Sequence, residues 1–291
     1  MIKQKLSRNA KKVDKFLINF IKKQKNSLLV KPMKYGVISG GKKIRSTIIF
    51  DMGRIFNLKE KNLINICAAV ECIHSYSLIH DDLPCMDNDS IRRGKPATHI
   101  KYGEASAVLA GSSLLTLAFE IIVDKSCLLN SRVKNEIIKS LSSCSGHTGI
   151  AGGQELDLKF ENKKKTLNQI IDMQKKKTGK LFNFCLYAVG TAANKSDKEK
   201  KLLSNLGEEI GLLFQFADDF LDNKGSKKLL GKPVKKDDKK GKSTLLNLMG
   251  ENKAYLYANN LNRKILRKLE KHGKKATELI KTIKFILERK F

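Results

Sequence analysis

Apolar residues recur at helical spacing along most of the chain. From Leu63 onward, apolar or small residues fall at positions 66, 67, 70, 73, 77 and 78, which is an i, i+3, i+4, i+7 stripe. Similar stripes run through about 41–57, 103–123, 132–150, 168–192, 199–223 and 253–287. The stretch Ala105–Val123 is apolar nearly all round, so we expect it to form a central helix of a bundle.

Polar breaks separate these stripes, at 25–35, 84–100, 124–132, 159–167, 193–198 and 223–243. None is long enough to be a domain linker, and no internal repeat is visible. Strand-like alternation is rare, and the chain has only 4 prolines. We therefore expect residues 1–291 to fold as one all-α domain, a helical bundle with a central cavity. No apolar stretch approaches the roughly 18 residues of a membrane span.

The chain is strongly basic, with 58 Lys and Arg against 29 Asp and Glu and a formal net charge of +29. Such a charge favours a polyanionic partner, either nucleic acid, an anionic membrane or a phosphorylated small molecule. The alternative is compositional drift toward Lys on solvated helix faces. We favour drift, because Lys is scattered along the whole chain and no patch combines it with aromatic residues.

The cysteines and the N-terminus indicate a cytoplasmic protein. The 6 cysteines form no C-x-x-C pair and no zinc-like spacing, which is typical of buried thiols in a reducing compartment. The apolar run Phe16–Ile21 is too short for a signal peptide and contains Asn19. We expect no stable membrane insertion.

A first acidic motif, His80-Asp81-Asp82-Leu83-Pro84, ends the helix that we expect to begin near Glu60. Pro84 cannot continue that helix, so Asp81 and Asp82 fall in its last turn. The negative end of a helix dipole disfavours carboxylates, and a bound cation would compensate for it. Paired aspartates are also common in surface turns, so this motif alone is weak evidence for a metal site.

A second acidic motif lies in the segment 214–222. Asp218 and Asp222 are spaced i, i+4, and Gln215 lies three residues before Asp218, so the three share a helix face. Like charges at this spacing destabilise a helix, and these lie among apolar residues. Carboxylates that leave ligand positions for water and phosphate suit Mg²⁺. Two such motifs on long apolar helices predict a site for a polyphosphate held through metal ions.

Basic residues complete the predicted site. Arg92-Arg93-Gly94 follows the first acidic motif, and the segment Gly40–Arg45 places Lys42 and Arg45 at a helix start, where free N–H groups also attract anions. Lys177-Thr178-Gly179 lies inside a predicted helix, where the glycine indicates a close approach. Gly241-Lys242-Ser243-Thr244 is similar to the end of a P-loop, but the required earlier glycine and strand are missing.

These residues together resemble the trans-isoprenyl diphosphate synthases, and specifically the bacterial farnesyl diphosphate synthases, from about residue 36 to the C-terminus. The resemblance rests on GGKKIR (40–45), ECIHSYSLIHDDLPCMDNDSIRRGKPATH (71–99), GGQELDL (152–158), KTG (177–179), FQFADDFLD (214–222), LGK (230–232) and GKST (241–244). It implies a short-chain prenyltransferase that joins isopentenyl diphosphate to dimethylallyl or geranyl diphosphate. It also implies a homodimeric helical bundle.

The resemblance assigns roles to individual positions. Asp81 and Asp87 would hold two Mg²⁺ ions and Asp218 a third, with Asp82 and Asp222 in support and Mn²⁺ as an alternative ion. The allylic diphosphate would contact Arg92, Lys177, Thr178, Gln215 and Lys232. Isopentenyl diphosphate would contact Lys42, Arg45, His74 and Arg93. The basic loop 223–243, by composition a solvated segment, would then be a lid that carries lysines toward phosphate.

Bulk beneath the first acidic motif sets the product length in this family. Tyr76 lies five residues and Ser77 four residues before Asp81, a pattern that resembles farnesyl synthases. The tyrosine ring would block a tail longer than fifteen carbons. Geranylgeranyl or geranyl diphosphate is the alternative product, and plain core packing is the alternative role for Tyr76.

Two departures from the family lie next to the first cations. Lys43 stands where the family usually has Arg, and Ser46 stands where it usually has Pro. Neither removes an implied ligand.

Three other classes of protein fit less well. A terpene cyclase would lack the isopentenyl site, and a non-catalytic subunit or a basic nucleic-acid-binding protein would not keep both acidic motifs.

Overall fold

The computed structural model describes residues 2–23, 27–38, 40–224 and 244–288. Within these residues nearly every element is a helix, and the one sheet is a two-stranded hairpin. The elements are α1 (Ile2–Lys22), α2 (Val30–Val37), α3 (Ile44–Ile55), the 3₁₀ turn η1 (Glu60–Asn62), α4 (Ile64–Asp81), β1 (Ile91–Arg92), β2 (Lys95–Pro96), α5 (Thr98–Tyr102), α6 (Glu104–Val123), α7 (Ser131–Ser145), α8 (Ile150–Phe160), α9 (Leu167–Gln174), the π-helical turn η2 (Lys175–Gly179), α10 (Lys180–Ala192), α11 (Asp197–Lys224), α14 (Leu245–Met249), α15 (Glu251–Glu270), the 3₁₀ turn η3 (Gly273–Ala276) and α16 (Thr277–Glu288).

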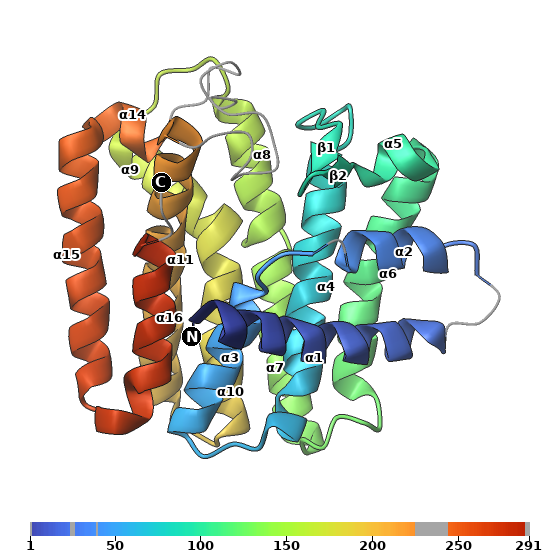
Figure 1. Cartoon of the computed structure of the whole chain (residues 1–291), viewed down its shortest axis with the longest axis horizontal. Coiled ribbons are helices and arrows are strands. Elements are labelled where there is room, and N and C mark those ends of the chain that lie inside the picture. The colour runs from blue at the N-terminus through green and yellow to red at the C-terminus, as the bar shows by residue number, and fades with distance from the viewer. Residues whose placement is uncertain (1, 24–26, 39, 225–243, 289–291) are drawn as a thin grey trace.

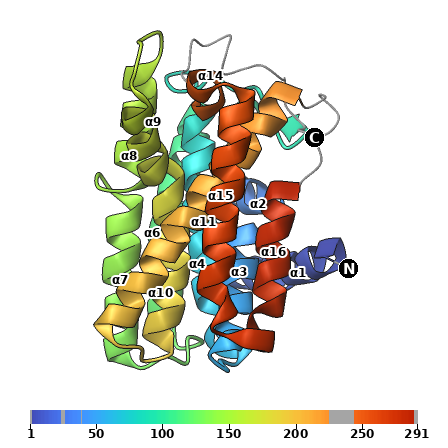
Figure 2. The same cartoon turned by 90° about the vertical axis from the view of Figure 1, so that its left-hand side faces the viewer.

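The long helices run alongside one another, and α1 crosses them (Figures 1 and 2). Helix α4 packs along α6, and α10 packs along α11, which α15 and α16 cover on its outer side. Helix α4 is buried on nearly all sides, which explains why its sequence is apolar or small almost throughout. The all-α bundle that the periodicity predicts is confirmed. That residues 1–291 form a single domain stays a prediction.

The helix boundaries correct the sequence-based expectations in three places. The break expected at 25–35 contains the start of α2, whose buried Met33 and Val37 lie one turn apart. The stripe at 253–287 is divided between α15 and α16, because the chain turns at Gly273 with a positive φ of 54°. The helix that ends at the first acidic motif begins at Ile64 rather than near Glu60.

Helix α6 corrects the expectation about membrane spans. Glu104–Val123 is long and apolar enough to cross a membrane by length and composition. One face of it, including Ala107, Leu114 and Ile121, is buried against the bundle. Its other face leaves Val108 42% and Leu109 54% exposed.

A buried ion pair fastens the N-terminal helix to the bundle. Lys5 Nζ donates to Asp51 Oδ2 of α3 at 2.9 Å and to Thr282 Oγ1 of α16 at 2.8 Å. Thr282 in turn donates to the same carboxylate oxygen at 2.6 Å. Burial raises the pKa of Asp51, and the charge of Lys5 opposes that rise. Charged groups in such a place are tolerated because each has its partner.

The ends of α4 and α11 lie at the same end of the bundle, and the hairpin β1–β2 lies beside the end of α4 (Figure 1). Helix α4 ends at Asp81, with Asp82 as its C-cap residue, and Pro84 lies just beyond, as the sequence predicts. In the hairpin turn, Arg93 and Gly94 have positive φ values of 54° and 74°, as a type I′ turn requires. The turn therefore holds Arg92 and Arg93 next to the end of α4.

Candidate active site

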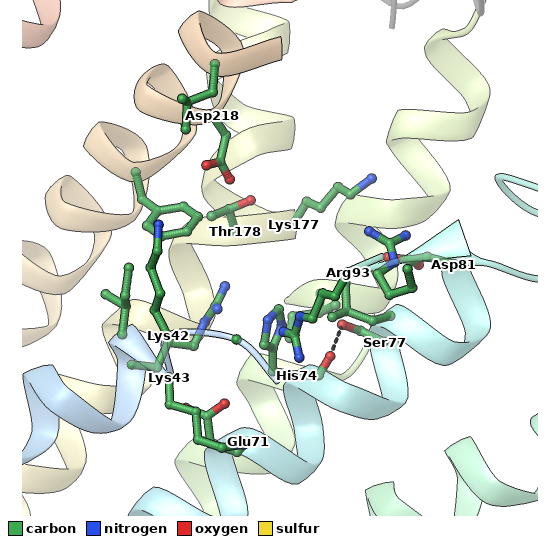
Figure 3. Close-up of a pocket in the computed structure, with 18 of the residues that line it drawn as sticks. Lys42, Lys43, Glu71, His74, Ser77, Asp81, Arg93, Lys177, Thr178 and Asp218 are labelled. Carbon is green, nitrogen blue, oxygen red and sulfur yellow. Dashed lines mark hydrogen bonds between the residues drawn. The ribbon is translucent and has the colours of Figure 1, made fainter. Parts of the chain in front are cut away.

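A cavity of about 420 Å³ opens between α3, α4, the hairpin, η2 and α11. Most of the predicted site residues line it, although they come from five elements far apart in sequence (Figure 3). The predicted residues that line the cavity are Lys42, Arg45, His74, Ser77, Asp81, Arg92, Arg93, Lys177, Thr178, Asp218 and Asp222. The structure therefore brings residues of both acidic motifs and of all three basic segments to one place.

The cavity is not lined by four of the predicted residues, namely Asp82, Asp87, Gln215 and Tyr76. Lys232 and nearly all of the basic loop 223–243 lie outside the described residues, so their roles stay predictions.

In the first acidic motif, the two adjacent aspartates face different partners. Asp82 is 2% exposed and accepts hydrogen bonds from Arg92 Nε at 2.9 and 3.2 Å, with a further bond from Arg92 Nη2. Asp89 adds an ion pair to the same guanidinium at 3.4 Å. Asp81 faces the cavity instead. The backbone N–H of Asp87 donates to the carbonyl oxygen of Asp81 at 2.8 Å, which folds the loop back over the helix end.

The environment of Asp81 suits a metal ligand. Burial raises its pKa to about 6, with Asp87 and Asp82 adding to the rise and Lys177 and Arg92 opposing it. A divalent cation would relieve this repulsion between carboxylates. Among the described residues, no group of three or more His, Cys, Asp or Glu side chains could hold an ion unaided. The carboxylates of Asp81 and Asp218 at the cavity fit Mg²⁺, which binds through one or two carboxylates together with substrate phosphate oxygens.

In the second acidic motif, Asp218 and Asp222 line the cavity, whereas Asp219 points into the protein. Asp219 accepts a hydrogen bond from Gln215 Nε2 at 2.8 Å and one from the backbone N–H of Leu245 at 3.1 Å. Gln215 also accepts a bond from Thr178 Oγ1 at 3.1 Å. Helical spacing therefore put Asp218 and Asp222 on one face, and that face lines the cavity. The spacing did not predict the role of Asp219, which accepts a hydrogen bond from a backbone N–H group at the start of α14.

Lys177 is positioned by the π-helical turn η2. Lys177 Nζ donates to Asp157 Oδ2 of α8 at 2.7 Å. A Cβ atom on Gly153 would lie 2.2 Å from the backbone nitrogen of Lys177, so only glycine allows this approach of α8. A close approach to Gly179 is present, but the residue that must be glycine is Gly211 of α11. A Cβ atom on Gly211 would lie 2.7 Å from Gly179 Cα, whereas a Cβ atom on Gly179 would have its nearest neighbour at 3.7 Å.

Two glycines shape the turn that precedes α3. Gly40 and Gly41 have positive φ values of 92° and 104°, which other residues rarely adopt. Arg93 Nη1 donates to the carbonyl oxygen of Gly40 at 2.6 Å. A Cβ atom on Gly41 would lie 2.8 Å from Arg93 Cζ, so the missing side chain leaves room for the guanidinium.

The neighbouring basic residues differ in environment. Lys43 is buried, and its Nζ donates to the carbonyl oxygen of Val37 at 3.1 Å and lies 3.2 Å from Asp14 Oδ1. This lysine fastens the turn to α1 and α2. Lys42 is exposed, with Nζ 5.4 Å from the centre of the Phe285 ring. Arg45 is 9% exposed, and its Cζ lies 4.6 Å from the centre of the Phe182 ring.

His74 stands among cations. Burial lowers its pKa well below the usual 6.5, and the charges of Arg45, Arg93, Lys43 and Arg92 lower it further. The imidazole is therefore neutral at pH 7 in the absence of an anion. Figure 3 shows it beside Arg93, one turn along α4 from Glu71.

Glu71 is a cavity residue that the sequence reasoning missed. It is 3% exposed and accepts a hydrogen bond from Ser46 Oγ at 2.7 Å. The backbone N–H of Ser46, in the first turn of α3, donates to the same oxygen at 3.4 Å. Two signals in the sequence pointed to it. Glu71 is the first residue of the motif 71–99, and Ser46 stands at a position that is usually proline in the family, which would have neither donor.

Tyr76 braces two helices beneath the first acidic motif. Its hydroxyl donates to the carbonyl oxygen of Ser145 in α7 at 3.2 Å, and its ring meets that of His80 edge-on at 5.6 Å between centroids. Ser77 lines the cavity, and its hydroxyl donates to the carbonyl oxygen of His74 at 3.0 Å. The role of these two residues in product length stays a prediction.

Comparison with known proteins shows the family of this chain. The sequence pattern of the polyprenyl synthetase family matches residues 26–285. Farnesyl diphosphate synthase from Escherichia coli is 41% identical over 238 residues, which are 81% of this chain and 80% of that protein.

Solved structures show the same fold. An FPP/GFPP synthase from Zymomonas mobilis superposes with a TM-score of 0.87 at 34% identity, covering 98% of each chain. A geranyltransferase from Helicobacter pylori, solved with magnesium and isoprenyl diphosphate, superposes with a TM-score of 0.82 at 31% identity, covering 99% of this chain and 97% of its own. The family match and the relatives agree with a cavity that gathers the acidic motifs and the basic segments. The chain belongs to the polyprenyl synthetase family.

Proposed function

We propose that this protein condenses isopentenyl diphosphate with dimethylallyl or geranyl diphosphate, in the presence of Mg²⁺, to give farnesyl diphosphate. The observation that carries the proposal is the arrangement of charges in one cavity. Asp81 and Asp218 come from the ends of two helices and face the same space (Figure 3). Lys42, Arg45 and Arg93 supply positive charge on another wall of it. Two diphosphates therefore find separate places, one beside the carboxylates and one among the cations.

The residues that would hold the metal are Asp81 and Asp87 for two ions and Asp218 for a third. Bound Mg²⁺ would neutralise the charge that grows on the departing diphosphate. Mn²⁺ has the same preference for oxygen ligands and is expected to substitute for it. Asp82 would support the first motif by orienting Arg92, as its hydrogen bonds indicate.

The chain's own residues would then bind, orient and exclude water. Lys177, Arg92 and Thr178 would hold the allylic diphosphate while its C–O bond breaks, because positive charge placed beforehand stabilises the leaving group. Arg45, Arg93 and His74 would hold isopentenyl diphosphate so that its double bond attacks the allylic cation. Leu78, Ile150 and Phe214 form apolar parts of the wall that keep water from the cation. A proton is then lost to the released diphosphate.

The first experiment is incubation of the purified protein with Mg²⁺, dimethylallyl diphosphate and labelled isopentenyl diphosphate, with the products separated by chain length. We expect a fifteen-carbon product, and no product when EDTA removes the metal. Asp81→Ala and Asp218→Ala should each abolish condensation. Asp172→Ala, on the exposed side of α9, is the matched control and should leave it unchanged. If the wild-type protein forms no condensation product, the proposed function is wrong.

We infer that the protein assembles as a homodimer through the apolar face of α6. Val108 and Leu109 are exposed, and Leu115 and Phe119 on the same helix are only partly buried. A second copy of α6 would cover this face by the burial of apolar surface. Sedimentation should show a dimer for the wild type and a monomer for Leu109→Asp. Leu202→Asp, which changes an exposed leucine on α11, should stay dimeric.

We further propose that the enzyme works in the cytoplasm without nucleic acid or membrane insertion as part of its function. The thiols support a reducing compartment, because all 6 cysteines are unpaired and 5 of them are buried. A salt-sensitive complex with DNA in a filter-binding assay would contradict this view.

A further inference from the structure

The inference concerns Glu71, a buried carboxylate within a wall of positive charge. Arg45, His74 and Arg93 line the same cavity, and these residues form the subsite proposed above for isopentenyl diphosphate. A carboxylate at this point competes with any anion for the same guanidinium groups. The inference rests on that proposed function.

The structure keeps Glu71 apart from the nearest of these cations. Within the described residues, no ion pair joins Glu71 to Arg45, although the charge of Glu71 is the first of those that raise the pKa of Arg45 against the effect of burial. Arg45 Nε is buried and has no hydrogen-bond partner. The guanidinium at the cavity therefore keeps one donor without a partner, and the charge of Glu71 acts on it.

What holds the carboxylate is the first turn of α3. Ser46 Oγ donates to Glu71 Oε1 at 2.7 Å, and the Ser46 N–H donates to the same oxygen at 3.4 Å. Ser46 Oγ also lies 3.3 Å from the carbonyl oxygen of Cys67, which fixes the hydroxyl between α3 and α4. The N-terminus of a helix further favours a carboxylate at this point. Ser46, the residue next to Arg45, thus binds the carboxylate that would otherwise compete with a diphosphate.

We propose that Ser46 is a positioning residue for the isopentenyl diphosphate subsite. Its hydroxyl holds Glu71 against α3, so that the carboxylate does not close on the guanidinium groups of Arg45 and Arg93. Without that hydroxyl, Glu71 turns toward them and must be displaced before a diphosphate can bind.

The test is a double-mutant cycle read as separate KM values for the two substrates. Ser46→Ala should raise the KM for isopentenyl diphosphate about ten-fold, the size expected for a hydrogen bond to a charged group. It should leave the KM for geranyl diphosphate within about two-fold of the wild type, since Lys177 and Thr178 are untouched. Glu71→Gln combined with Ser46→Ala should cancel most of the rise, because the competing charge is gone. Ser46→Thr keeps the hydroxyl and should behave as wild type.

The matched control is Thr47→Val in the same turn of α3. Thr47 is fully buried, and its hydroxyl accepts a hydrogen bond from Asn9 of α1, away from Glu71. This variant should lose some thermal stability without any change in either KM. If Ser46→Ala raises both KM values equally, or if Glu71→Gln fails to cancel its effect, Ser46 has only a structural role and the inference is wrong. Absence of condensation by the wild-type protein would instead refute the proposed function.

Discussion

The carboxylate of Asp157 accepts a hydrogen bond from Lys177 Nζ at 2.7 Å, across the gap between α8 and the π-helical turn η2. Asp157 is 7% exposed, so this bond is shielded from water on the side of the aspartate. Lys177 also acts electrostatically on Asp81, which lies at the end of α4. One buried carboxylate thus orients a cation toward the first acidic motif, although it lines no part of the cavity itself.

We predict that Asp157→Asn weakens binding of the allylic substrate. A neutral amide holds the lysine less firmly than a carboxylate does, at a cost of about 1.5 to 3 kcal/mol for a charged hydrogen bond. The kcat/KM for geranyl diphosphate should therefore fall at least ten-fold in steady-state assays. The exposed Asp172→Asn should have no effect. An unchanged kcat/KM in Asp157→Asn would show that Lys177 is positioned by the backbone of η2 alone.

Tyr76→Ala is predicted to lengthen the product. Its ring fills space one turn below Asp81, and removal of that ring opens room toward α7 for further isoprene units. Chromatography of the products should show a shift from fifteen carbons to twenty or more. Tyr76→Phe keeps the ring and loses only the hydrogen bond to Ser145, so it should still give the wild-type product. If both variants give only the fifteen-carbon product, Tyr76 is plain core packing.

His74 makes the stability of the unliganded protein depend on pH. Its folded-state pKa lies well below 6.5, so on acidification the unfolded chain takes up a proton first. Stability is therefore present above pH 6.5 and is lost as the pH falls through 6.5 toward the folded pKa. Relative to His74→Gln, the wild type should lose more unfolding free energy between pH 7.5 and pH 6, by up to about 1 kcal/mol.

Urea denaturation at the two pH values measures this loss. Thr47→Val, which removes no titratable group, should respond to pH as the wild type does. An equal pH response of the wild type and His74→Gln would mean that His74 accepts a proton in the folded state.

Lys5→Met is predicted to destabilise the protein by about 3 kcal/mol, because it leaves buried Asp51 with only the longer ion pair to Arg54 at 3.3 Å as countercharge. Lys12→Met breaks the more exposed ion pair with Glu60 and should cost less than about 1 kcal/mol. Both losses can be read from thermal or urea denaturation. Adding Asp51→Asn to Lys5→Met should recover part of the loss, and a failure to recover any would assign the loss to packing of the Lys5 stem.

The sequence predicts well those features that depend on neighbours in the chain. Pro84 locates the end of α4, and helical spacing puts Asp218 and Asp222 on the face that lines the cavity. The same rule could not separate Asp81, which faces the cavity, from Asp82, which turns to Arg92. That difference depends on where the hairpin lies, which is a tertiary property.

Residues that act through distant partners escaped the sequence argument. Glu71 lies within a motif, yet nothing in the spacing of that motif indicates its partner Ser46, which lies 25 positions away. Asp157 lies within a motif, yet its spacing gives no sign that Lys177 is its partner. Motifs thus locate the cavity, whereas long-range hydrogen bonds determine which carboxylates remain for a ligand.

The π-helical turn η2 makes the geometry of the cavity depend on the number of residues in this turn as well as on their side chains. A π turn holds one residue more than an α turn, so α9 is rotated by roughly 100° relative to α10 compared with an unbroken helix. Removal of a single residue from 175–179 would leave a regular helix of almost the same length. It would also rotate Lys177 away from Asp157. Helix content and site geometry are therefore separable at this turn, and a variant that looks intact by circular dichroism would have lost the orientation on which phosphate binding depends.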